Sequence, residues 1–313
     1  MTLHRTGALL LALALWLPGQ VTLTPRPKPP SKEDTLPMAD IRVNSTLILV
    51  PVSVNDPLNR PVSGLEKENF RVYEDKVEQP ITSFAMDDEP VAVGLVFDTS
   101  GSMGEKLQRS RMAAREFFRL SDPGDEYFLV EFDSSPRLEV HLTSDTGAIE
   151  SQLTFSRSHG STALLDAILL ALQEMKHSKK NKKALLVISD GGDNNSRYTP
   201  KEVNRVVVES DVLIYSIGVF GGGSTPEEAG GPGLLSQISE RTGGRLFEAN
   251  AAELPNIAKM IGIELRNRYV IGYSPKNQVH DGKYHHILVR VIPPRGLPKL
   301  SAHWRTGYNA PVE

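Results

Sequence analysis

The sequence predicts an α/β fold, a doubly wound and mostly parallel sheet, with a small β segment before it and another after it. Near-continuous apolar stretches typical of buried parallel strands, such as residues 91–97 and 184–189, alternate with helical stretches through the middle of the chain. On either side, short runs of strand-forming residues, such as 70–74 and 285–292, are separated by turn residues.

The middle of the chain gives the elements in order. Strands are expected at residues 91–97, 127–132, 138–142, 184–189, 212–219 and 244–247, and helices at 106–120, 163–175, 200–210, 234–242 and 253–266. The turn at residues 133–136 predicts a hairpin at one edge of the sheet. The stretch 220–233 is rich in glycine and proline, and it is interpreted as a flexible loop that could shape the rim of a site.

The flanks have a β pattern. Strands are expected within residues 41–54, at 70–74 and at 81–84, and again at 269–273, 285–292 and 299–304. The predicted division is an N-terminal β module at 39–89, the α/β domain at 90–267 and a C-terminal β segment at 268–313. One arrangement open to the two β segments is a single small β-sandwich.

The first 38 residues predict export. A short basic start precedes an apolar run at residues 8–17, which has the length of a signal-peptide core and is too short to span a bilayer comfortably. Residues 1–20 are therefore predicted to be a cleaved signal peptide, with an uncleaved anchor as the alternative, and no membrane span is expected after cleavage. Residues 21–38, rich in Pro and Lys, predict an extended linker.

Composition narrows the classes of function. The 313 residues include 35 Lys and Arg against 38 Asp and Glu, a net charge of −3, so no surface for nucleic acid is expected. The absence of cysteine excludes disulfides and thiol nucleophiles. An exported protein without disulfides fits a bacterial periplasm, cell surface or secreted location better than an animal extracellular space.

The loop after the first strand of the α/β region contains candidate metal ligands. Asp98, Ser100 and Ser102 lie within five residues, and Gly101 and Gly104 let the backbone of this loop fold tightly. In a doubly wound sheet this is the carboxyl end of a strand, where ligand sites lie. One carboxylate and two hydroxyls are hard oxygen ligands, which suit Mg²⁺, or Mn²⁺ and Ca²⁺ in its place.

Two later loops complete an oxygen set. Thr162 opens a predicted helix and Asp190 closes a predicted strand, so both fall at compatible places beside the first loop. In this order on a βα alternation, Asp98, Ser100, Ser102, Thr162 and Asp190 resemble the metal-ion-dependent adhesion site of von Willebrand factor type A (VWA) domains. The resemblance covers residues 91–265 and implies the VWA fold with one bound divalent ion.

The resemblance also implies the role of each ligand. Ser100 and Ser102 would bind the ion directly, Thr162 would do so in the high-affinity state, and Asp98 and Asp190 would act largely through waters. Two carboxylates leave a divalent ion able to accept a carboxylate from a partner protein. The implied function is metal-dependent protein binding of an adhesion type, without enzymatic activity. The alternative is a structural or assembly role in an envelope complex, where the metal mainly stabilises the fold.

The flanks resemble those of bacterial VWA-domain proteins that are abundant in Acidobacteria. The resemblance rests on residues 70–75, 268–275, 281–286 and 305–308, and no specific ligand follows from it.

Several polar residues have an ordinary interpretation beside a functional one. Asp166 and Asp193 either support the site or simply solvate a helix and a loop, and His159 either contacts a ligand or is an ordinary loop residue. His285 and His286 alternate across a strand, so they cannot both face one metal. Ser102 as a catalytic serine would need a histidine base.

Overall fold

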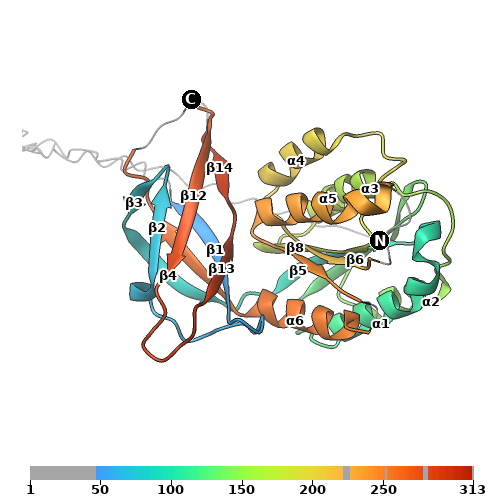
Figure 1. The fold of residues 1–313 in the computed structure, drawn as a ribbon, viewed down its shortest axis with the longest axis horizontal. Coiled ribbons are helices and arrows are strands. Elements are labelled where there is room, and N and C mark those ends of the chain that lie inside the picture. The colour runs from blue at the N-terminus through green and yellow to red at the C-terminus, as the bar shows by residue number, and fades with distance from the viewer. Residues whose placement is uncertain (1–46, 221–225, 251, 278–280, 312–313) are drawn as a thin grey trace, which may run out of the picture. The chain divides into compact units, whose positions relative to one another are not determined.

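The computed structural model describes residues 47–220, 226–250, 252–277 and 281–311. The predicted signal peptide and linker lie outside these residues. Within the described ranges, no helix is both long and apolar enough to cross a membrane. The described chain forms an α/β domain and a β-sandwich (Figure 1).

The α/β domain is built on a six-stranded sheet in the order β10-β9-β8-β5-β6-β7. Its parallel strands are β5 (Val91–Asp98), β6 (Glu126–Phe132), β8 (Lys182–Ser189), β9 (Leu213–Gly218) and β10 (Leu246–Glu248). The edge strand β7 (Pro136–Thr143) pairs antiparallel with β6, as the predicted hairpin requires. The predicted doubly wound, mostly parallel sheet is therefore confirmed.

Helices cover both faces of this sheet (Figure 1). One face packs against α1 (Leu107–Phe118), α2 (Thr146–Phe155) and α6 (Leu254–Arg266), the other against α3 (Leu164–Met175), α4 (Pro200–Glu209) and α5 (Pro226–Thr242). Every residue of β5 is buried, with Val93 and Leu95 in one core and Ala92 and Val96 in the other. A strand covered on both faces needs the continuous apolar run that the sequence shows.

Two elements of this domain differ from the prediction. Helix α2 was not predicted, and α5 begins at Pro226, so the interpretation of residues 226–233 as a loop is wrong. One glycine there has a packing reason: a Cβ on Gly231 would lie only 2.5 Å from the carbonyl oxygen of Asp190. A glycine at this position lets α5 approach the loop after β8 backbone to backbone.

The β-sandwich consists of two four-stranded sheets, in the orders β13-β1-β11-β4 and β14-β12-β2-β3. Its strands are β1 (Ile48–Asn55), β2 (Phe70–Glu74), β3 (Val77–Gln79), β4 (Ile81–Asp87), β11 (Arg268–Tyr273), β12 (Tyr284–Val291), β13 (Ser301–Trp304) and β14 (Gly307–Asn309). A single-turn helix, η1 (Lys67–Asn69), precedes β2. The short strands β3 and β14 were not predicted.

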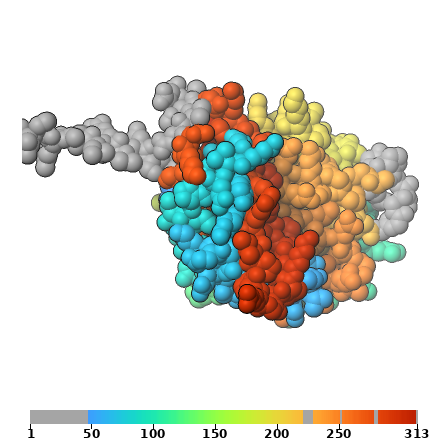
Figure 2. Space-filling view, turned by 60° about the vertical axis from the view of Figure 1, so that its left-hand side comes forward, coloured from blue at the N-terminus to red at the C-terminus, as the bar shows by residue number. Residues whose placement is uncertain are grey.

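Each sheet of the sandwich combines strands from before and after the α/β domain. Figure 2 shows the N-terminal and C-terminal segments, blue to cyan and red, side by side on its surface, where β2 pairs with β12. Rings from both flanks meet inside: Phe70 lies 5.3 Å from Phe84 and 5.1 Å from Tyr269 between centroids. The two flanks share one core, so the single sandwich is the arrangement that forms.

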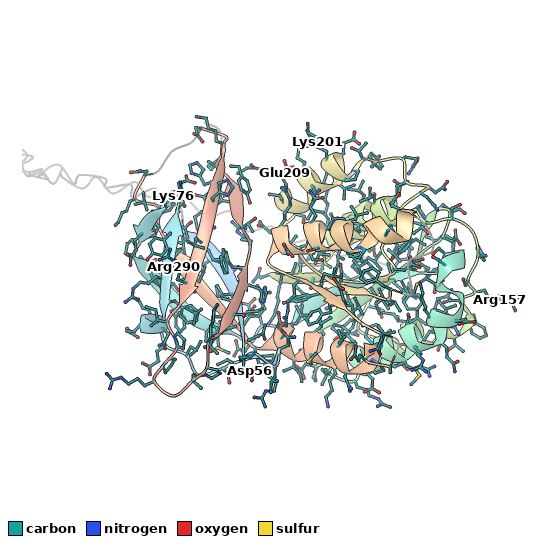
Figure 3. The ribbon with its side chains drawn as sticks, in the orientation of Figure 1. Asp56, Lys76, Arg157, Lys201, Glu209 and Arg290 are labelled. Atoms are coloured by element: carbon teal, nitrogen blue, oxygen red, sulfur yellow. The ribbon has the colours of Figure 1, made fainter. Side chains whose placement is uncertain are left out.

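The two parts are joined by short connections and buried polar contacts. Helix α6 ends at Arg266 and β11 begins at Arg268, so Asn267 alone separates them. The Glu264 carboxylate near the end of α6 accepts hydrogen bonds from Asn55 of β1 and from Tyr215 of β9. Figure 3 shows the side chains of both parts, with Lys76 and Arg290 labelled on the sandwich.

Candidate functional site

The two predicted carboxylate ligands lie at adjacent strand ends. Asp98 is the last residue of β5, Asp190 directly follows β8, and these strands pair with Phe97 opposite Ile188. Both carboxylates are buried, with 0% and 1% of their surface exposed. The parallel pairing of β5 and β8 thus brings together two loops that are about ninety residues apart in the chain, as strand ends in a doubly wound sheet allow.

The carboxylate of Asp98 is held by its own loop and by β8. Its Oδ1 accepts the backbone N–H of Ser100 at 2.8 Å, and its Oδ2 accepts the hydroxyl of Ser189 at 2.6 Å. Burial and the nearby negative charge of Asp190 raise the pKa of Asp98 to about 7, although these hydrogen bonds oppose the shift. A charged Asp98 is therefore costly unless a cation lies beside it.

The predicted hydroxyl ligands come from two loops. The Oγ atoms of Ser100 and Ser102 are 3.1 Å apart. Thr162 is 5% exposed, its backbone N–H donates to the side chain of Asn194 at 2.9 Å, and its carbonyl accepts the N–H groups of Asn194 and Asn195. The polar loop after Asp190 therefore fixes the backbone of Thr162.

Asp190 has a partner that the sequence did not reveal. The ammonium of Lys106 lies 3.1 Å from its Oδ2, and the Lys106 side chain is 18% exposed. Oδ1 of Asp190 is buried and has no hydrogen-bond partner among the described residues. Lys106 ends the short helix η2 (Gly101–Lys106) and stands at the N-terminus of α1, where a positive charge is disfavoured by the helix dipole. Nothing in the sequence placed this lysine beside a residue 84 positions away.

Asp166 and Asp193 hold backbone in place. Asp193 accepts the N–H of Leu165 at 2.9 Å in the first turn of α3, and Asp166 accepts the N–H of Arg197 at 3.0 Å. Both contacts fix the segment between β8 and α4. These two carboxylates therefore position the loops that carry Thr162 and Asp190.

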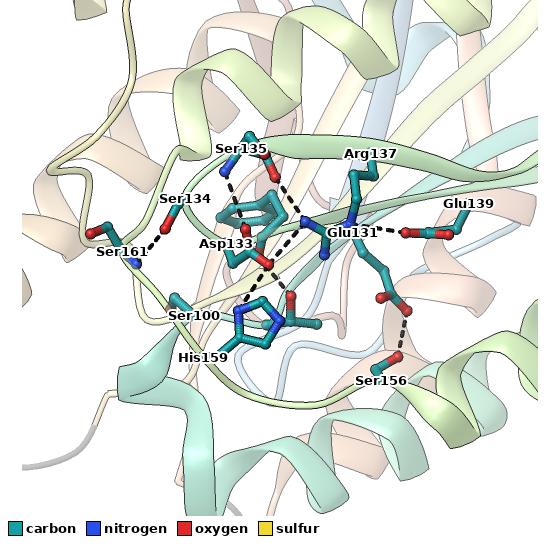
Figure 4. Close-up of polar contacts among 12 residues, drawn as sticks. Ser100, Glu131, Asp133, Ser134, Ser135, Arg137, Glu139, Ser156, His159 and Ser161 are labelled. Atoms are coloured by element: carbon teal, nitrogen blue, oxygen red, sulfur yellow. Dashed lines mark hydrogen bonds and ion pairs between the residues drawn. The ribbon is translucent and has the colours of Figure 1, made fainter.

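A further carboxylate, Asp133, organises the edge of the site (Figure 4). It follows β6, and its Oδ2 lies 2.9 Å from Nη1 of Arg137 and 3.3 Å from Nδ1 of His159. Its carbonyl accepts the N–H of Ala163 at 2.8 Å, next to Thr162. The sequence placed Asp133 in a hairpin turn and gave no sign of this role, because all but one of these contacts join distant parts of the chain.

The arrangement offers two buried carboxylates and nearby hydroxyls, which are donors for a hard divalent cation and not for a soft metal. No group of three or more His, Cys, Asp or Glu side chains suited to a metal occurs in the described ranges. The predicted ligand set would not be counted as such a group, because it has only two carboxylates and its other three members are hydroxyls. The unpaired Oδ1 of Asp190 fits a cation, and bound metal stays a prediction.

Comparison with known proteins gives likenesses in sequence and in structure. The sequence model of the von Willebrand factor type A domain matches residues 93–192. An uncharacterized protein of Borreliella burgdorferi is 28% identical over 185 residues, which are 50% of this chain and 53% of that protein. The chain thus spans about half the length of the curated relative that it matches.

Solved structures are similar at low identity. A von Willebrand factor type A protein from Catenulispora acidiphila matches with a TM-score of 0.51 and 14% identity, over 87% of this chain and 75% of that one. The vWF domain of the type V pili tip protein Mfa5 from Porphyromonas gingivalis matches with a TM-score of 0.47 and 15% identity, over 57% and 97%. At such identities a likeness speaks for the fold alone.

Proposed function

We propose that this chain, which contains a von Willebrand factor type A domain, is an exported protein that binds a partner protein through a divalent metal ion. The ion would be held by Asp98, Ser100, Ser102, Thr162 and Asp190, with Mg²⁺ as the first candidate and Mn²⁺ or Ca²⁺ as substitutes. When bound, the ion supplies an open coordination position for a carboxylate of the partner. The exported location rests on the apolar run at residues 8–17.

One observation carries the metal proposal. Oδ1 of Asp190 is a buried carboxylate oxygen without a hydrogen-bond partner in the described chain, beside the equally buried Asp98. Buried carboxylates are normally paired or bound to a cation, and leaving one oxygen unpaired costs free energy. A divalent ion at this position would satisfy Asp190 and relieve its repulsion with Asp98.

The surroundings of the site favour an acidic protein partner. The segment after α2 is hydrogen-bonded to the loop after β5, which carries Ser100 and Ser102. The N–H of His159 donates to the carbonyl of Thr99, and the N–H of Gly101 donates to the carbonyl of Gly160. The last residue of α2, Phe155, exposes its ring, 77% accessible, and this segment exposes the guanidinium of Arg157, which points outward in Figure 3. An exposed aromatic ring beside a cation is a typical protein-binding surface.

The proposal is of binding and not of catalysis. The hydroxyl of Ser102 contacts the hydroxyl of Ser100, and the ring of His159 contacts Asp133, so His159 is not arranged as a base for Ser102.

Calorimetric titration of the full chain with Mn²⁺ tests the metal site. Asp98→Ala and Asp190→Ala should each weaken binding at least about tenfold, which is about 1.4 kcal/mol. Glu209→Ala, a change of the same kind at the exposed end of α4, should bind as the parent does. Unchanged Mn²⁺ affinity in both aspartate variants would show that the site is assigned wrongly.

Capture of the partner from the native envelope tests the use of the ion. Thr162→Ala should stay folded and lose capture, and a chelator should abolish capture by the parent. If the chelator lowers only the melting temperature and capture persists, the ion has the structural role of the alternative.

A further inference from the structure

The contact between Lys106 and Asp190 has a consequence for the proposed metal site. Lys106 is not among the five predicted ligands, yet its ammonium lies 3.1 Å from Oδ2 of Asp190. The lysine lies on the loop that carries Ser100 and Ser102, and the aspartate lies on the loop after β8. The ion pair therefore links the two halves of the candidate site from within the protein.

We propose that Lys106 is a built-in counter-ion that competes with the divalent metal for Asp190 and so sets the metal affinity of the site. This inference rests on the proposed function, since it concerns the same five ligands. It adds a separate claim, that Lys106 opposes metal binding, although Lys106 lies in the same short helix, η2, as the predicted ligand Ser102.

The charges show why the two cations exclude each other. Asp98 and Asp190 carry at most two negative charges in a nearly inaccessible position. With Lys106 beside them, one of these charges is already balanced, and a divalent ion would bring the local sum above zero. Two cations a few ångströms apart repel strongly at low dielectric. The metal must therefore either displace the ammonium or tolerate it, and both weaken binding.

The lysine side chain is suited to being displaced. Its ammonium is a compact charge on a flexible four-carbon stem, and 18% of the side chain already meets solvent. An ammonium that leaves Asp190 can become hydrated without a change in the backbone of η2. The ion pair also explains how Asp98 and Asp190 can be buried together when no metal is bound, because Lys106 supplies the missing positive charge.

Titration of the full chain with Mn²⁺ tests this competition. Lys106→Met keeps the length of the side chain and removes the charge, and it should bind Mn²⁺ at least about tenfold more tightly than the parent. Lys106→Arg keeps the charge and should stay within about threefold of the parent. The matched control is Lys176→Met, an exposed lysine at the C-terminal end of α3, whose other end lies next to Thr162.

A melting experiment in chelator gives a second readout. Without metal, Lys106→Met leaves both carboxylates without a counter-ion, so its melting temperature should fall by about 3 °C or more below that of the parent. The same variant should gain more than the parent when Mn²⁺ is added. Lys176→Met should follow the parent in both conditions.

The outcomes separate this inference from the proposed function. If Asp190→Ala abolishes Mn²⁺ binding while Lys106→Met binds as tightly as the parent or more weakly, the metal site stands and the competition is wrong. If neither the parent nor Lys106→Met binds Mn²⁺, both proposals fail. Tighter binding by Lys106→Met with an unchanged Lys176→Met supports both.

Discussion

Two buried carboxylates, Asp190 at the candidate metal site and Glu264 at the junction with the sandwich, have the same exposure but differ in how many hydrogen bonds they accept. Each is 1% accessible. Glu264 accepts hydrogen bonds from Asn55 at 3.1 Å, Tyr215 at 2.9 Å and Arg245 at 2.6 Å, so both of its oxygens are used. Asp190 has Lys106 on one oxygen and no partner among the described residues on the other.

Under the proposed function, this difference separates a carboxylate that holds the fold together from one that would bind the ion. A buried charge with several donors from different elements fixes those elements together. A buried charge with an unused oxygen weakens the fold, and in the proposed function a divalent cation would offset that cost. The contrast concerns the two carboxylates and not their whole surroundings, since Nη2 of Arg268 at the junction is also unpaired within the described chain.

The largest expected effect is at the junction. Glu264→Gln removes the charge that pairs with Arg245 and turns an amide toward that guanidinium, so the free energy of unfolding should fall by about 3–5 kcal/mol. Urea denaturation of the full chain measures the loss, with the exposed Glu209→Gln as control. A loss below about 1 kcal/mol would mean that Glu264 contributes no more than a surface carboxylate does.

The matching change at the candidate metal site should have the opposite effect on stability. Asp98→Asn also removes one buried charge, but that charge lies beside Asp190, and the amide can keep the bond from the N–H of Ser100. In chelator at pH 8 the variant should be more stable than the parent by about 1–2 kcal/mol. The same urea series measures it. If Asp98→Asn is destabilised as Glu264→Gln is, the proposed distinction between the two carboxylates is wrong.

A smaller effect is expected from loosening the connection between the two regions. Helix α6 carries Glu264 and meets β11 after Asn267 alone, so a displacement of α6 would strain the sandwich. A Gly-Ser pair inserted after Asn267 should change Mn²⁺ affinity by about fivefold, within the usual range of coupling free energies. Insertion after Asn267 leaves Arg268, which pairs with Asp87, inside its strand.

The control for this insertion is the same pair placed after Gly296, in the turn between β12 and β13. That turn is distant in sequence from α6 and should leave the affinity unchanged. Equal affinities for both insertions and the parent would mean that the sandwich is a support without coupling to the site.

The comparison also explains what the sequence could predict. The strands of the α/β domain follow from apolar runs such as β5, because burial on both faces leaves a local signal. Asp98, Thr162 and Asp190 could be proposed as a set because the strand and helix ends on which they lie are also visible in the local sequence. Helix α2 left a weak signal, since Ile149 and Leu153 alone are buried in it.

Other features depend on contacts between distant residues and could not be predicted. The pairing of Lys106 with Asp190 joins residues 84 positions apart, and that of Asn55 with Glu264 joins residues 209 apart. The helical start of α5 was hidden because Gly231 is there for packing against the loop of Asp190, not for a turn. Local propensity cannot distinguish these two uses of glycine.

The smallest expected effect is a pH dependence within the sandwich. Nδ1 of His285 in β12 lies 2.8 Å from Asp75, and its Nε2 lies 3.4 Å from Asp281. Burial of the ring opposes protonation, but the hydrogen bonds to Asp75 and Asp281 and the charge of Asp75 outweigh it and raise the pKa of His285 above 6.5. Glu74, 4.0 Å away, acts in the same direction.

The sign of this effect follows from the raised pKa. Protonated His285 stabilises the fold fully below the unfolded pKa of about 6.5, and this contribution is lost as pH rises through the folded value. The stability difference between the parent and His285→Asn should therefore be largest below pH 6.5 and shrink above it. His286→Asn is the control, because its ring contacts Tyr284. A difference for His285→Asn that grows with pH would contradict this assignment, and a constant one would show that the ion pair adds nothing to the stability of the sandwich.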